Sequence, residues 1–287
     1  MLKVGLIQTT SSDQPADNLQ TVSQMICDAH AQGAQFIVTP EVTNCVSTDR
    51  KHQAHVLSLQ EDDISLRVFC ELAQELGVWL MIGSLALKSG DPDGRFVNRC
   101  FLIAPDGSIA AEYDKIHMFD VALSETETYQ ESKGYRPGDV ASIARCDFGT
   151  VGLSICYDLR FPHLFRDLAQ AGAQIITVPS AFATISGEAH WHVLLRARAI
   201  ETGCFIIAPA QTGQHVTTVG KQRKTYGHSL VVSPWGDVLL DAETTTGVSI
   251  IEIDLETVET ARRRIPSLQH DRKYQAPKCQ TPPQKTP

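Results

Sequence analysis

Short apolar runs alternate with amphipathic segments at the start of the chain, and this alternation constrains the fold more than any other feature. The segment KVGLIQ (3–8) reads as a strand, and apolar residues then recur at helical spacing from Leu19 to Ala29. The strand AQFIVTPE, a helix from Ile64 to Leu76 closed by Gly77, and the strand VWLMIGSL follow. Strand, helix, strand, helix, strand is the order with which parallel α/β sheets begin.

Antiparallel hairpins join this parallel core later in the chain. The segments NRCFLIAPDGSIAAEYDK (98–115), IARCDFGTVGLSIC (143–156) and HSLVVSPWGDVLLDAE (228–243) each hold two apolar runs joined by a turn. Between the second and third hairpins the first half's order recurs, as a helix over 162–170, the strand QIITVPSAF, a helix from about His190 to Thr202 capped by Gly203, and the strand CFIIAPAQ. The strand GVSIIEIDL and a short helix complete the pattern. We therefore predict an α/β fold with α+β character, in which two sheets pack together and helices lie outside.

Composition excludes several classes of partner. The 287 residues carry a formal charge of -8 without a basic stripe, which excludes nucleic acid as a partner. No apolar stretch is long enough to span a membrane or to act as a signal peptide, so we expect a soluble, cytoplasmic protein whose partners are small molecules. No linker divides the chain, which predicts one domain over residues 1–275, and the polar, proline-containing end APKCQTPPQKTP (276–287) predicts a disordered tail.

Metal and cofactor motifs are missing from the sequence. The eight cysteines form no CxxC pair, and without a signal peptide they are expected to be reduced thiols. The HWH run (His190–His192) lacks partners at ligand spacing, so no metal site is predicted. There is neither a GxGxxG after a strand nor a GxxxxGK[ST], and no cofactor is expected.

Three titratable residues follow apolar strands. Glu41 ends the run FIVTPE, Lys115 comes just after a hairpin strand, and Cys156 ends the run TVGLSIC. Ligands and catalytic groups collect at the carboxyl ends of strands, so a carboxylate, an ammonium and a thiol could meet in one crevice. Taken singly, each residue has a plain structural alternative: a core thiol, a capping or surface carboxylate, and a solvated lysine.

Three segments together are specific. TPE, YDKIHMFD and GLSICYDLRFP resemble the signature segments of the nitrilase superfamily, the carbon-nitrogen hydrolases, and the resemblance spans essentially residues 1–275. It implies a four-layer α-β-β-α sandwich and a Glu-Lys-Cys triad on Glu41, Lys115 and Cys156. It also implies a supporting glutamate after the lysine segment, which Glu131 in YQESKGYRPGD supplies.

The residue types fit amide hydrolysis independently. A thiol of ordinary pKa is only partly ionised at neutral pH, so a nucleophilic Cys156 needs a base, and Glu41 can take its proton. Attack on an amide carbon creates an oxyanion, which Lys115 and the backbone N–H of Tyr157 could stabilise. Glu41 would then protonate the leaving amine and activate the water that cleaves the thioester. Glu131 is expected to keep Lys115 charged or to orient the substrate.

The resemblance also suggests a substrate. YDKIHMFD, TVPSAF and AHWHVLLRARAIETG look most like the Nit branch, and within it the deaminated glutathione amidase type, which releases 2-oxoglutarate and cysteinylglycine. A substrate with several carboxylates needs cationic or N–H donors, and Arg160, Ser180 and Phe182 are the candidates by position. A structural ion pair is the alternative for Arg160. The KQRK run (221–224) is expected to be an exposed loop, with Arg223 on a lid as the alternative.

Rival functions remain open from sequence alone. An ω-amidase acting on 2-oxoglutaramate or 2-oxosuccinamate would share the triad. An N-carbamoyl amino acid hydrolase is disfavoured by YDLRFP after the cysteine, and a nitrile-cleaving enzyme by Tyr157 where that branch has tryptophan. A non-catalytic regulatory binding protein on the same fold is the rival from another class. The family commonly pairs subunits through the helix near His190–Thr202 and the helix after the cysteine, so the resemblance implies a homodimer or higher homo-oligomer. On the first of these helices Trp191, Leu194, Leu195 and Ile200 are expected on one side.

Overall fold

The computed structural model describes residues 1–125 and 127–277 and contains two six-stranded sheets. In spatial order the first sheet consists of β16 (Gly247–Ile253), β1 (Leu2–Gln8), β2 (Phe36–Val38), β3 (Trp79–Lys88), β4 (Phe96–Ile103) and β5 (Ile109–Asp114). The second consists of β15 (Val238–Asp241), β14 (Leu230–Val232), β11 (Phe205–Ala208), β10 (Ile175–Thr177), β9 (Thr150–Leu153) and β8 (Ile143–Arg145).

The two sheets have the same pattern of strand orientations, although the strand beside β1 is β16 whereas the strand beside β9 is its predecessor in the chain, β8. In the first, β1, β2 and β3 are parallel, while β16, β4 and β5 add antiparallel strands at the edges. In the second, β9, β10 and β11 are parallel, while β8, β14 and β15 add the antiparallel strands in the same arrangement. All three predicted hairpins form, as β4-β5, β8-β9 and β14-β15. The repeated order of elements in the sequence therefore corresponds to a repeated sheet.

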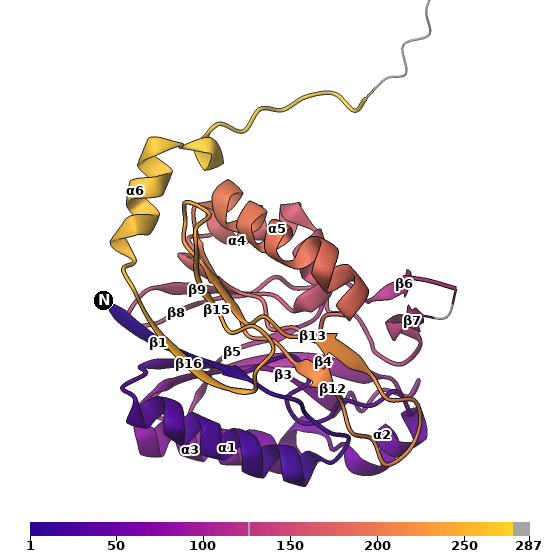
Figure 1. Cartoon of the computed structure of the whole chain (residues 1–287). Coiled ribbons are helices and arrows are strands. Elements are labelled where there is room, and N and C mark those ends of the chain that lie inside the picture. Colours follow the sequence, from indigo (N-terminus) through magenta and orange to yellow (C-terminus); the bar gives the residue numbers. More distant parts are fainter. Residues whose placement is uncertain (126, 278–287) are drawn as a thin grey trace, which may run out of the picture.

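Helices connect the parallel strands and cover the outer faces. α1 (Pro15–Ala31) and α3 (Ile64–Leu76) lie against the first sheet, and α4 (Pro162–Gln170) and α5 (Thr184–Thr202) lie against the second (Figure 1). The four layers are helix, sheet, sheet and helix, which confirms the predicted α-β-β-α sandwich.

Shorter elements complete the fold, and some of them border the site described below. They are the helices α2 (Arg50–Val56) and α6 (Glu256–Arg264), the 3₁₀ turns η1 (Gln60–Asp62), η2 (Glu131–Lys133), η3 (Cys156–Arg160) and η4 (Ser267–Gln269), and the strand pairs β6 (Asp120–Ala122) with β7 (Thr128–Gln130) and β12 (Thr212–Gln214) with β13 (Lys224–Tyr226).

Glycines end two of the predicted helices. α3 stops at Gly77 (φ 65°) and α5 at Gly203 (φ 58°), left-handed conformations that glycine adopts without steric cost. The predicted start of α5 at His190 is wrong, because the helix begins at Thr184. Gly187 lies in this early part of the helix, where a β-carbon would be only 2.3 Å from the Tyr226 ring. This close packing against Tyr226 explains why a glycine, which disfavours helix formation, occupies position 187 inside α5.

Each sheet buries alternate residues on opposite faces. Val4 and Leu6 of β1 are in the core between the sheets, whereas Ile7 is in the core beneath α1 and α3, with Ile26 and Phe69. All five side chains are at most 1% exposed, and burying each contributes roughly 1.5–3 kcal/mol.

One prediction about α5 is wrong. Trp191 and Leu195 are fully buried as expected, but Ile200 is 54% exposed on the outer face. Within the described residues, no helix combines the length and apolarity needed to cross a membrane. The disordered tail is predicted over residues 276–287, and its part from residue 278 onward lies outside the described residues.

Candidate active site

Three segments that are distant in sequence bring Glu41, Lys115 and Cys156 to one cavity. Glu41 lies shortly after β2, Lys115 directly follows β5, and Cys156 lies shortly after β9 at the start of η3. Each side chain is at most 5% exposed, and all three line a cavity of about 350 Å³. The carboxyl ends of strands from both sheets therefore form the floor of this cavity, as the sequence predicts.

Lys115 is held between two carboxylates. Its Nζ donates to Glu41 Oε1 at 2.9 Å and to both carboxylate oxygens of Glu131, at 3.0 and 2.9 Å. Burial alone would lower the pKa of Lys115, but the charges of Glu131 and Glu41 raise it well above its ordinary value. The ammonium therefore stays charged in a site where an unpaired charge would be very costly.

The Glu41 carboxylate accepts hydrogen bonds from three groups. Besides Lys115, Asn98 Nδ2 donates to Oε1 at 2.9 Å and the Ala181 N–H donates to Oε2 at 2.7 Å. The Cys156 thiol lines the same cavity, close enough for its pKa to respond to the charge of Glu41. Burial would raise the pKa of Glu41, but the charges of Lys115 and Arg223 and these hydrogen bonds lower it below its ordinary value. Glu41 is therefore an ionised acceptor next to the sulfur.

Cys156 sits on strained backbone. Its φ of 48° lies in the left-handed region, which is rare for a side chain with a β-carbon, and Val42, next to Glu41, has φ 46°. The Cys156 N–H donates to Pro179 O at 2.9 Å, which fixes the turn. Burial and the charge of Glu41 raise the pKa of the Cys156 thiol far above its ordinary value, although Lys115 opposes this shift. The resting sulfur is therefore a protonated thiol in the same cavity as an ionised carboxylate.

A buried aspartate joins the cysteine turn to the lysine loop. Asp158 Oδ2 accepts from the Ile155 N–H at 2.9 Å and from the Tyr113 hydroxyl at 2.7 Å. Its Oδ1 accepts from the N–H of His117 at 3.0 Å and lies 2.7 Å from that residue's Nδ1. Sequence reasoning missed this role, although Asp158 and His117 both lie inside the quoted signature segments.

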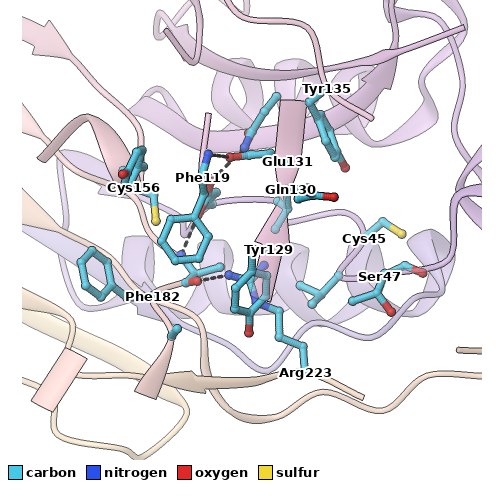
Figure 2. A pocket seen from close by; sticks show the side chains of 18 of the residues that line it. Cys45, Ser47, Phe119, Tyr129, Gln130, Glu131, Tyr135, Cys156, Phe182 and Arg223 are labelled. Atoms are coloured by element: carbon cyan, nitrogen blue, oxygen red, sulfur yellow. Dashed lines mark hydrogen bonds between the residues drawn. The ribbon is translucent and has the colours of Figure 1, made fainter. Parts of the chain in front are cut away.

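Aromatic rings and cations surround the opening of the cavity. Figure 2 shows Cys156, the rings of Phe119, Tyr129 and Phe182, and Arg223 grouped around it. The Phe119 N–H donates to Glu131 Oε2 at 2.6 Å, which ties this ring to the charged cluster.

Besides Lys115, the cations that line the cavity are Arg50, Lys221 and Arg223. The Arg50 guanidinium lies 5.1 Å from the centre of the Tyr135 ring, and that of Arg223 lies 5.4 Å from the centre of the Tyr129 ring. Glu127 lines the cavity as well, so outside the cluster of Glu41, Lys115 and Glu131 three cations face one carboxylate, and this excess favours an anionic ligand.

The predicted binding residues have different outcomes. Phe182 lines the cavity, whereas Arg160 and Ser180 are not among its lining residues. Arg160 instead places both Nη atoms 3.3 Å from His190 Nδ1 and stacks on the ring of Tyr157. Ser180 is fully buried and donates to Val178 O at 3.0 Å. Sequence reasoning did not single out Arg50, because nothing local indicates that α2 faces the cavity.

Comparison with known proteins identifies the family to which this chain belongs. The sequence profile of the Carbon-nitrogen hydrolase family matches residues 3–263. The chain belongs to the carbon-nitrogen hydrolase family. This confirms the resemblance drawn from the three signature segments, and the enzyme is an amidase-type hydrolase of the Nit branch of the nitrilase superfamily.

Individual relatives and structures agree with this family. The chain is 38% identical over 272 residues to the deaminated glutathione amidase of Yersinia enterocolitica, covering 94% of this chain and 92% of that protein. The crystal structure of the C. elegans NitFhit protein matches with a TM-score of 0.86 at 35% identity, over 94% of this chain and 65% of that one. Nit3 of Saccharomyces cerevisiae, a member of branch 10 of the nitrilase superfamily, matches with a TM-score of 0.80 at 26% identity, over 94% and 96% of the two chains.

Proposed function

We propose that this carbon-nitrogen hydrolase cleaves the amide of deaminated glutathione, with Cys156 as nucleophile, Glu41 as general acid and base, and Lys115 as the oxyanion donor. The observation that carries the proposal is an ionised Glu41 carboxylate that accepts a hydrogen bond from the Lys115 ammonium at 2.9 Å and shares one cavity with the Cys156 thiol. These are the three groups that acyl transfer through a thioester requires.

Acylation begins when Cys156 Sγ attacks the amide carbon and Glu41 takes the thiol proton. The carbonyl π electrons move to oxygen, and the resulting oxyanion is stabilised by Lys115 Nζ and by the Tyr157 N–H. The adjacent Cys156 N–H is already donated to Pro179 O, which supports Tyr157 as the backbone donor. Each such donor is worth about 3 kcal/mol in comparable sites. The C–N bond then breaks, and Glu41 gives its proton to the leaving amine.

Deacylation reuses the same groups. Glu41, again a carboxylate, takes a proton from water as the water oxygen attacks the thioester carbon. The second oxyanion collapses, the C–S bond breaks, and Glu41 returns the proton to sulfur. Glu131 supports both steps, because its two contacts with Lys115 Nζ keep this ammonium charged.

The cavity supports a substrate with carboxylates at a distance from the amide. Deaminated glutathione carries a carboxylate at each end, and the rim offers Arg50, Lys221 and Arg223 as partners. Relatives at 36–38% identity from bacteria and mammals are named deaminated glutathione amidases, which supports this substrate. Cleavage would release 2-oxoglutarate and cysteinylglycine.

One comparison of substrates tests the proposal. The purified enzyme is incubated with deaminated glutathione, 2-oxoglutaramate and an N-carbamoyl amino acid, with the Cys156→Ala variant as control. Deaminated glutathione is expected to have the highest kcat/KM, and the variant should be inactive on all three. Much faster release of ammonia from 2-oxoglutaramate would make the chain an ω-amidase. No turnover of any amide would favour a regulatory binding protein.

The assembly is proposed to be a homodimer formed through α5. Ile185, Val193 and Ile200 are 48%, 68% and 54% exposed on this helix, and such an apolar row supports contact with a second subunit. Light scattering on the native protein should give a dimer mass, and Val193→Glu should shift it towards the monomer.

We also propose that residues 1–275 form one domain and that the enzyme works in the cytoplasm. The seven cysteines in the described part of the chain are all free thiols, which supports a reducing compartment. Limited proteolysis should leave residues 1–275 as one resistant fragment, and cell fractionation should recover the enzyme with cytoplasmic markers.

A further inference from the structure

A cluster of two histidines and one aspartate lies away from the catalytic cavity. His192 is on α5, His228 precedes β14, and Asp241 ends β15. His192 Nε2 lies 2.9 Å from Asp241 Oδ2, and His228 Nδ1 lies 2.9 Å from Asp241 Oδ1. The three side chains are 34%, 20% and 27% exposed, so an ion could reach them from solvent.

The backbone is strained at this cluster as well. Within residues 1–125 and 127–277, four residues other than glycine have positive φ. Val42 and Cys156 are at the candidate active site, while His228 (φ 57°) and Glu243 (φ 51°) are at this cluster. Left-handed backbone is strained for residues other than glycine, so it persists only where surrounding contacts hold it, and such positions concentrate at functional sites.

We propose that His192, His228 and Asp241 bind a divalent transition metal ion of the Zn²⁺ class. One ligand atom from each residue lies within 4.8 Å of the other two, and two imidazoles with one carboxylate are ligands that Zn²⁺ accepts. Tetrahedral ligands about 2.0–2.1 Å from zinc are roughly 3.3 Å apart. Asp241 Oδ2 lies 2.9 Å from His192 Nε2 and 3.1 Å from His228 Nδ1, so these two contacts need to open by only a few tenths of an ångström. The fourth position would be left to water.

Neighbouring groups already orient the ligands as outer-shell partners do in metal sites. The Glu243 N–H donates to Asp241 Oδ1 at 2.8 Å, and Trp191 Nε1 donates to the backbone oxygen of His228 at 2.8 Å. The Tyr226 ring stacks on the His228 imidazole with centres 4.4 Å apart. Such partners fix ring orientation and raise metal affinity.

A bound ion would strengthen a connection between α5 and the second sheet that already includes the hydrogen bonds from Trp191 to His228 O and from Arg196 to Gly236 O. It would link α5 to the β14-β15 hairpin, beside Tyr226 of β13. The Tyr226 N–H donates to Phe182 O at 2.9 Å, and Phe182 lines the catalytic cavity. The ion would therefore stabilise the backing of the cavity without touching the reacting groups.

Calorimetric titration with ZnCl₂ tests the site in the full-length Cys156→Ala protein, which removes the catalytic thiol as a competing ligand. One Zn²⁺ per chain is expected, with a rise in Tm on the order of 5 °C when the ion is in large excess over Kd, and MgCl₂ should not bind. His192→Ala and Asp241→Asn should each weaken Zn²⁺ binding at least 10-fold. His30→Ala, an exposed histidine on α1, is the matched control and should bind as before.

Cobalt substitution provides a second readout that needs no ligand variant. Co²⁺ should give visible absorption bands of a four- or five-coordinate site without the thiolate charge-transfer band that a cysteine ligand produces. Absence of Zn²⁺ binding, a thiolate band, or undiminished affinity in both His192→Ala and Asp241→Asn would each overturn the proposal. Far-UV circular dichroism of the variants distinguishes a lost ligand from a lost fold.

Discussion

Replacing Lys115 by methionine should leave two buried carboxylates facing each other without a cation. In the native chain Nζ is 2.9 Å from an oxygen of Glu41 and 2.9 Å from one of Glu131. At an effective dielectric constant of about 20, unit charges at this separation attract by roughly 6 kcal/mol, and desolvation of the ammonium offsets part of that. Removing one partner from a buried pair costs about 3–5 kcal/mol. We expect the free energy of unfolding at pH 8 to fall by that amount.

The loss should shrink at lower pH. Without the ammonium, burial and repulsion raise the pKa of Glu41 above its unfolded value, so the folded variant binds more protons than the unfolded chain. Its stability then falls as pH rises through the raised folded pKa. In the native chain the pKa of Glu41 is lowered, so the stability it contributes is present above the unfolded pKa and is lost only as pH falls through the folded pKa. Native stability should therefore show no such change between pH 5 and 8.

Urea unfolding at pH 5 and pH 8, followed by tryptophan fluorescence, measures these differences. The matched control is Lys115→Met with Glu131→Gln, which returns the net charge of the cluster to its native value of -1. This double variant should recover roughly 1.5–3 kcal/mol of stability but no activity. A Lys115→Met protein that loses less than about 1 kcal/mol at pH 8, or equally much at both pH values, would refute the electrostatic reasoning.

Three further predictions concern the candidate site. Arg50→Gln should raise KM for a dicarboxylate about 10–100-fold with little change in kcat, because a charged hydrogen bond at the rim is lost, whereas Arg160→Gln should leave KM unchanged. The reverse pattern in steady-state kinetics would restore the sequence-based assignment of Arg160 to substrate binding. The rate at which iodoacetamide alkylates Cys156 should show no inflection near pH 8.5, because burial and the charge of Glu41 raise the pKa of this thiol. An inflection at that pH would contradict the conclusion that the resting sulfur is a protonated thiol of raised pKa. Asp158→Asn should reduce kcat at least 10-fold while circular dichroism stays native, and full activity would show that the cysteine turn holds its shape without this charge.

Local chemistry explains which elements could be predicted. The hairpins β4-β5, β8-β9 and β14-β15 depend on turn residues and alternating apolar runs that are adjacent in sequence. The end of α5 at Gly203 was predictable for the same reason. Its start at Thr184 was not, since a glycine inside a helix disfavours helix locally and only the distant Tyr226 ring requires it. The exposure of Ile200 follows from helix geometry, because nine residues at roughly 100° each place it on the face opposite Trp191, so grouping the two on one side was an error in applying the helical period.

The candidate site also contains residues that local sequence signals identify and residues that only distant packing places there. Glu41, Lys115 and Cys156 could be found because each follows a recognisable strand, and strand ends converge. Arg50 could not be found, because its place on the rim depends on how α2 packs rather than on its own neighbours. His192 lies in the HWH run, but its partner Asp241 is 49 residues away, beyond any ligand spacing that a motif describes.

The pairing of β1 with β16 joins the first strand of the chain to the last. Seven residue pairs connect Leu2–Gln8 with Gly247–Ile253, so β1 has an open hydrogen-bonding edge until almost the whole polypeptide exists. At about 5–20 residues per second, a ribosome needs on the order of 10–50 s to supply that partner. A nascent chain therefore presents an unpaired edge strand, the kind of surface that promotes aggregation, throughout most of its synthesis. The first sheet can therefore be completed only after residues 247–253 have been synthesised.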